Sequence, residues 1–94
     1  MQEQITQLHI EILALCFAVK AKGHDAFYDY YGHVSWAHVR IFKDGWSEGG
    51  SPSKQFDCLE AKSFEGQDND LILNKLTECK EYLEGLLNAK SSQE

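Results

Sequence analysis

The sequence predicts an α+β domain in which an N-terminal and a C-terminal helix lie on one face of a small antiparallel sheet of about three strands (α-β-β-(β)-α). Apolar residues at helical spacing near both ends of the chain, and an aromatic, β-branched middle with turn signals, predict this class. The length agrees, because 94 residues supply one hydrophobic core. We therefore interpret residues 1–94 as a single small domain, with a frayed tail at 90–94 and a mobile loop at 47–54.

Residues 2–22 are predicted to form the first helix, which ends at Gly23. Good helix formers dominate this stretch, and it contains neither proline nor glycine. Glu3 near its start and Lys20 near its end carry the charges that the helix dipole favours. One face repeats apolar residues at helical spacing and is predicted to pack on the core: Ile5, Leu8, Ile12, Leu15 and Val19.

A second apolar stripe on this helix consists of Ile10, Leu13 and Phe17, about 150° from the first. One sheet cannot cover both stripes, so two interpretations remain open. In one, the C-terminal helix covers the second stripe, and in the other, part of it contacts another chain. Because symmetric pairing is the commonest way to bury such a row, we expect a homodimer with these three side chains in its interface.

Residues 25–48 are predicted to form hairpin strands, because Phe, Tyr, Trp, Val and Ile are frequent there. The turn signals lie at 32–33 and 44–45. If both are two-residue turns, Tyr31 lies opposite Val34, and this register sorts the side chains onto two faces. The more continuous apolar face is predicted to lie against the helices: Ala26, Tyr28, Tyr30, Ala37, Val39, Ile41 and Trp46.

The opposite face of the predicted hairpin is the surface that we expect to bind a partner. Aromatic planes and arginine are the groups that anchor protein interfaces, and aromatic planes also stack on unpaired bases. The alternative is that another element, such as residues 55–64, covers this face and makes it a second small core. The predicted partner-binding side chains are Phe27, Tyr31, Trp36, His38, Arg40 and Phe42.

The remainder of the chain is predicted to add one strand and one helix. Residues 55–64 are interpreted as a third strand with imperfect alternation. A second helix is predicted from about 70 to 88, with Asp68 or Asn69 as its N-terminal cap. Its apolar stripe is Ile72, Leu76, Cys79, Leu83 and Leu86, with Leu71, Tyr82 and Leu87 at the margins.

No pattern in the sequence nominates a metal, a cofactor or a catalytic site. The four histidines, at positions 9, 24, 33 and 38, fall on different predicted elements and are interpreted as ordinary surface or turn residues. Three cysteines, Cys16, Cys58 and Cys79, are an odd number without a close pair, so we expect free thiols. No glycine pattern of a phosphate-binding loop precedes a helix.

The predicted order of helix, three strands and helix is similar to that of the double-stranded RNA-binding domain. The resemblance is one of element order alone. The second predicted helix opens with Asp68-Asn69-Asp70, where that family presents lysines to phosphate. The resemblance therefore implies a fold and does not imply RNA binding.

The net charge of −6 disfavours a partner held mainly through phosphate or anionic lipid. Residues 1–4 lack the basic region of a secretion signal, so we expect a cytoplasmic protein that does not enter a membrane.

We predict a small acidic, non-enzymatic module, an inhibitor or adaptor of the kind found, by analogy, among phage and mobile-element products. It would bind another protein through the aromatic face or through an acidic helix face at Glu78, Glu81 and Glu84. Single-stranded nucleic-acid binding by aromatic stacking is the alternative, and a small enzyme with an unrecognised site is the second alternative.

Overall fold

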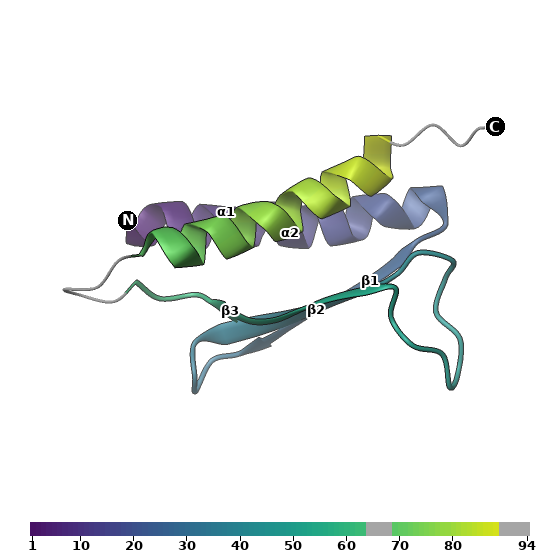
Figure 1. Ribbon diagram of the computed structural model, residues 1–94, viewed down its shortest axis with the longest axis horizontal. Coiled ribbons are helices and arrows are strands. Elements are labelled where there is room, and N and C mark those ends of the chain that lie inside the picture. The colour runs from purple at the N-terminus through teal and green to yellow at the C-terminus, as the bar shows by residue number, and fades with distance from the viewer. Residues whose placement is uncertain (64–68, 89–94) are drawn as a thin grey trace.

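The computed structural model describes residues 1–63 and 69–88, and it confirms the predicted fold class, including the third strand. The predicted cap residue Asp68 and the tail at 90–94 lie outside the described residues. In chain order the elements are α1 (Gln2–Ala18), a 3-10 turn η1 (Val19–Lys22), β1 (Asp25–Tyr31), β2 (Trp36–Phe42), β3 (Lys54–Glu60) and α2 (Asp70–Asn88) (Figure 1).

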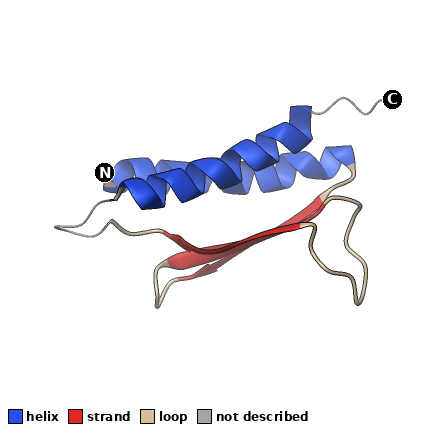
Figure 2. Ribbon diagram, viewed as in Figure 1, coloured by secondary structure: helices blue, strands red, loops and turns tan. Residues whose placement is uncertain are grey.

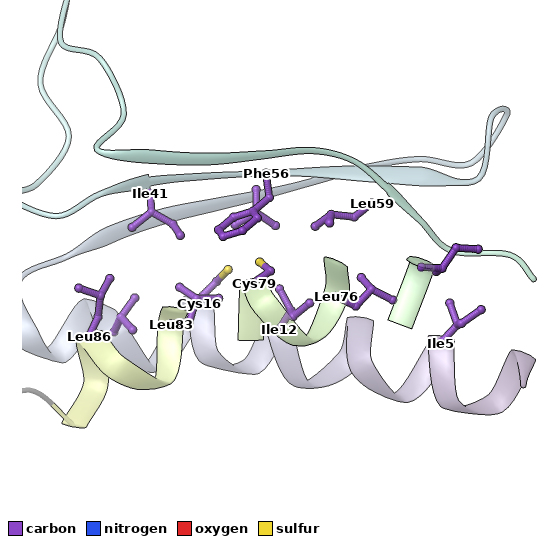
Figure 3. Close-up of a cluster of buried hydrophobic side chains, with 13 residues drawn as sticks. Ile5, Ile12, Cys16, Ile41, Phe56, Leu59, Leu76, Cys79, Leu83 and Leu86 are labelled. Atoms are coloured by element: carbon purple, nitrogen blue, oxygen red, sulfur yellow. The ribbon is translucent and has the colours of Figure 1, made fainter. Parts of the chain in front are cut away.

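The domain has two layers. The three strands form one antiparallel sheet in the order β1-β2-β3, so β2 is central and both other strands are edges. Both helices lie on the same face of the sheet (Figure 2), and they run in the same direction along it (Figure 1). The core fills the space between the helix layer and the sheet, where Figure 3 shows side chains of both layers pointing toward one another.

Helix α1 buries the face that the sequence predicts, shifted by part of a turn. Val19 continues the buried row into η1, and Gly23, with a left-handed φ of 88°, ends it. Leu8 and Leu15, predicted in the row, are half-buried at its margin. The buried positions of α1 alternate at spacings of four and three residues: Ile5, His9, Ile12 and Cys16.

The register of the first hairpin differs from the prediction. Tyr31 pairs with Trp36 and not with Val34, because the turn has four residues, 32–35. Ser35 takes a left-handed φ of 55° in that turn. The register moves by two residues, and an even shift returns every side chain to the same face, so the face assignment survives.

The sequence predicts that Trp46 lies on a core-facing strand, but the structure places it in a loop. A turn does form, but at 43–44 and not at the predicted 44–45, with the N–H of Gly45 donating to the carbonyl of Phe42 at 3.0 Å. The chain then fails to resume a strand until Lys54, and Trp46 is 54% exposed. Its backbone N–H donates to Oδ2 of Asp25 at 2.7 Å, which ties the connecting loop to the start of β1.

A bulge explains the imperfect alternation of β3. Phe56 and Leu59 are both buried against the helices although three positions separate them, which an uninterrupted strand forbids. The register shifts between their partners Val39 and Ala37, and Cys58 has a left-handed φ of 55° at this point. The extra residue turns Leu59 back toward the core.

The three cysteines are unpaired in the structure. Cys16 of α1 and Cys79 of α2 lie in the core between the two layers (Figure 3). Burial raises the pKa of Cys16 to about 11 and that of Cys79 to about 12. Both side chains therefore remain protonated and serve as small apolar core residues.

His9 is a buried polar link between α1 and the sheet, and not the surface residue that the sequence suggested. Its Nε2 lies 2.8 Å from the carbonyl of Glu60, which can only accept, so Nε2 carries the proton. Nδ1 then accepts from the hydroxyl of Tyr28 at 2.7 Å. Burial lowers the pKa of His9 and raises that of Tyr28 to about 12, so both groups stay neutral.

Acidification should destabilise the protein through His9. Its pKa is depressed in the folded state, so below the ordinary value of 6.5 the unfolded chain binds more protons. We expect the free energy of unfolding to fall between about pH 7 and about pH 5, by at most about 1.4 kcal/mol per pH unit from this group. Urea titrations at several pH values should give a shallower pH dependence for His9→Gln, whereas His33→Gln, an exposed control, keeps the wild-type slope. An identical slope in His9→Gln would contradict the assignment.

Candidate protein-binding face

The side of the sheet turned away from the helices is the candidate site. No element among residues 1–63 and 69–88 lies over it (Figures 1 and 2). The described part of the segment 55–64, residues 55–63, does not cover it, contrary to the alternative considered above, because Lys54–Glu60 extends the sheet as β3. We call this surface the open face and define it by Phe27, Asp29, Tyr31, Trp36, His38 and Arg40.

Three of the predicted residues gather at the end of the hairpin next to its turn. Tyr31 and Trp36 are cross-strand partners. The ring of His38 contacts Tyr31 at a centroid distance of 5.3 Å and Trp36 at 6.3 Å. Tyr31 is 41% exposed, while Trp36 and His38 are half-buried. The side chains thus form a continuous aromatic cluster whose position is set by the strands.

The bulge in β3 orients His38. Its Nδ1 accepts the backbone N–H of Cys58 at 3.1 Å. Oδ1 of Asp57 lies 3.3 Å from the same nitrogen. An imidazole that accepts at Nδ1 carries its proton on Nε2, so the contact between Nδ1 and Asp57 is not a hydrogen bond.

Arg40 occupies the other half of the open face and is already engaged. Its guanidinium lies 4.8 Å from the centroid of the Phe27 ring. Nη2 donates to Oδ2 of Asp29 at 3.4 Å. Arg40 is the one lysine or arginine in the defined open face, and Asp29 offsets its charge. The defined set is therefore aromatic and nearly neutral, and Asp57 of β3 adds a carboxylate beside His38.

The sequence predicts that Phe42 binds a partner, but the structure buries this side chain. Its side chain is 5% exposed and packs edge-on against Phe27, with ring centroids 5.6 Å apart. The residue lies at the end of β2, where the connecting loop begins. Phe42 therefore belongs to the folded interior, and the accessible aromatic set is smaller than the sequence predicts.

The stripe predicted for the dimer interface is exposed. Ile10 is 55%, Leu13 39% and Phe17 75% accessible, because α2 packs on the other side of α1. The interpretation in which the C-terminal helix covers this stripe is therefore wrong.

The acidic helix face lies on α2, away from the open face. Glu78 and Glu81 are exposed, whereas Glu84 is half-buried and lies 4.0 Å from Nζ of Lys80. Lys80 also forms an ion pair with Glu11 of α1 at 2.9 Å, and this contact lowers the pKa of Glu11. The two predicted binding surfaces are thus separate, with the helix layer and the sheet between them.

Sequence reasoning missed a groove between α1 and β1. It encloses about 270 Å³, and its floor includes the linked pair His9 and Tyr28. The sequence signal was the helical position of His9, four residues after Ile5 and three before Ile12. The lining residues are Thr6, His9, Ile10, Leu13, Tyr28, Tyr30 and Ala61.

Among the described residues, no group of three or more His, Cys, Asp or Glu side chains is placed to hold a metal ion. In the same part of the chain, no helix is both long enough and apolar enough to cross a membrane. Comparisons with protein families, with curated proteins and with solved structures find no match to this chain. Function is therefore inferred from the geometry of the chain itself.

Replacement of two aromatic residues should distinguish the interior of this side of the sheet from its surface. Phe42→Ala removes a buried ring, and we expect the free energy of unfolding to fall by about 3 kcal/mol. Tyr31→Ala removes an exposed ring and should cost about 1 kcal/mol or less. Chemical denaturation measures both. Equal losses for the two variants would show that Phe42 is not part of the interior.

Proposed function

We propose that the chain is a small, acidic, non-enzymatic module that binds another protein through its open face. The observation that carries this proposal is an aromatic surface on two paired strands, with no described helix or strand over it. Tyrosine, tryptophan and arginine are the residues that most often dominate binding energy in protein interfaces. Here Tyr31, Trp36 and Arg40 lie on one face.

The placement of these side chains on strands supports binding at low entropic cost. Ring contacts of His38 with Tyr31 and Trp36 already restrict their rotamers in the free protein. Binding a partner therefore costs less side-chain entropy here than it would if the same residues lay on a loop.

Charge favours protein over nucleic acid as the partner. Binding to single strands requires cations that neutralise phosphates, as well as stacking platforms. The arginine of the open face is paired with Asp29, and the chain as a whole carries a net charge of −6. Single-stranded nucleic acid is the alternative partner, on the strength of the aromatic cluster alone.

The proposed setting is the cytoplasm, where thiols stay reduced. Three unpaired cysteines, two of them buried in the core, suit a reducing compartment. A module of this size without a nominated catalytic group fits an inhibitor or adaptor, which acts by occupying a surface of its target.

Trp36→Ala tests the proposal directly. We expect the variant to recover at least about 30-fold less of the partner from an extract of the native host, as for a central interface tryptophan. Because Trp36 is half-buried, its free energy of unfolding should fall by about 1–2 kcal/mol. Trp46→Ala is the matched control, because Trp46 is an exposed tryptophan outside the open face. Quantitative affinity capture with mass spectrometry measures the recovery.

Equal recovery by Trp36→Ala and Trp46→Ala would reject the open face as the binding site. Titration with single-stranded oligonucleotides, followed by tryptophan fluorescence, tests the alternative. We expect weak binding at physiological salt. If oligonucleotides bind tightly, if that binding weakens steeply with added salt, and if Trp36→Ala abolishes it, the partner is a nucleic acid and not a protein.

A further inference from the structure

Helix α1 presents an uncharged face to solvent on the side away from α2. The face continues into η1 at Ala21, and its six positions are all exposed and follow one another at spacings of four, three, one, three and four residues. The pattern reads the same in both directions and centres on the small residue Ala14 and its neighbour Leu13. We call this set the α1 seam: Thr6, Ile10, Leu13, Ala14, Phe17 and Ala21.

The seam contains both a hollow and a projecting side chain. Thr6, His9, Ile10 and Leu13 stand at positions i, i+3, i+4 and i+7, the four-residue hole that receives a side chain of a facing helix. These four line the groove of about 270 Å³ against β1. Phe17 lies one turn beyond the hole and is 75% exposed.

The chemistry of the groove favours an apolar side chain as occupant. Both ring nitrogens of His9 and the hydroxyl hydrogen of Tyr28 are used in their mutual link and in the bond to Glu60. These groups therefore have little hydrogen-bonding capacity left for a polar ligand. The volume also lies just below the range of about 300–1000 Å³ that is usual for small-molecule sites.

We propose that the occupant is a second copy of this chain, in a two-fold dimer formed by antiparallel packing of α1 against α1. With the helices crossing at Leu13 and Ala14, Phe17 of the partner subunit enters the hole, and Phe17 of the first chain enters the partner's hole. The surface is thus self-complementary, as a two-fold interface requires. Ala14 at the crossing lets the two backbones approach closely.

Charge agrees with this arrangement. Antiparallel packing brings Glu3, at the start of one helix, toward the end of the other, which carries Lys20 and Lys22. Lys20 and Asp25 already form an ion pair with each other at 2.7 Å, so Lys22 is the cation at that end that we expect Glu3 to approach. The seam itself is free of charge, so two acidic chains can meet there.

The seam lies on the helix layer and the open face lies beyond the sheet, so this dimer does not depend on the proposed function. A contact made mainly by one helix is small, at the lower end of specific interfaces. We therefore expect a dissociation constant in the micromolar range, on the order of 10 µM.

Sedimentation equilibrium of the full chain, from about 5 to about 500 µM, measures the association. Phe17→Asp should weaken it at least about 30-fold, because it places a carboxylate in the apolar hole. Leu71→Asp is the matched control, since Leu71 of α2 is 72% exposed and lies off the seam. It should change the dissociation constant by less than about twofold. A monomer at the highest concentration, or equal effects of the two variants, would overturn the proposal.

Cysteine cross-linking tests the geometry. Ala14→Cys lies at the two-fold crossing, so mild oxidation should join two copies through a disulfide between identical positions. Ala21 is also exposed but would face Thr6 of the partner subunit, so Ala21→Cys should form no more cross-linked dimer than the wild type. Preferential cross-linking through Ala21→Cys would rule out the proposed crossing.

A charge reversal tests the orientation. Glu3→Lys should weaken the dimer about threefold by placing like charges at both ends of the seam. Glu78→Lys, on the exposed face of α2, makes the same change in net charge and should not weaken it. If Glu3→Lys strengthens the dimer as much as Glu78→Lys does, the antiparallel arrangement is wrong.

Discussion

Two helices side by side fill one face of a three-stranded sheet, and this constraint decides which surfaces remain open. The buried rows of α1 and α2 both point toward the sheet, where they meet Val39, Ile41 and Leu59. Once that face is covered, the described chain has no further helix or strand to place over the other one. The same packing turns the second stripe of α1 outward, because α2 occupies only one of its flanks. Both proposed binding surfaces thus follow from where the core lies.

The link through His9 holds this arrangement in place at one end of the sheet. It joins α1 to β1 through Tyr28 and to the end of β3 through Glu60. A buried imidazole is tolerated because both of its nitrogens are satisfied, and it specifies how the helix is oriented over the strands. The groove beside it therefore has a fixed floor, which a purely apolar contact would define less sharply.

The two surfaces suit different partners. The open face combines aromatic rings with one internally paired cation, whereas the α1 seam is aliphatic and aromatic without charge. Acidic side chains at Glu78 and Glu81 surround neither of them, since they lie on the outer side of α2. A dimer formed through the seam would carry two open faces, and two linked sites bind a bivalent target more tightly than one.

The sequence by itself determined the elements and their faces. Helical periodicity placed α2 at 70–88, where the structure has it, because a periodic apolar row survives any packing against a flat surface. Strand parity assigned Trp36 and His38 to one face and Val39 to the other even though the turn length was wrong. An even shift in register leaves sidedness unchanged.

Only the tertiary structure decided the positions that depend on contacts distant in sequence. The burial of His9 required Glu60, 51 residues away, and the positive φ of Cys58 required a bulge that no local residue preference announces. Phe42 left the predicted binding set because it is buried against Phe27 of the neighbouring strand. Local spacing fixes the direction in which a side chain points along its own element. The packing of elements against one another decides which residues that side chain contacts, and these contacts cannot be derived from the sequence of one element.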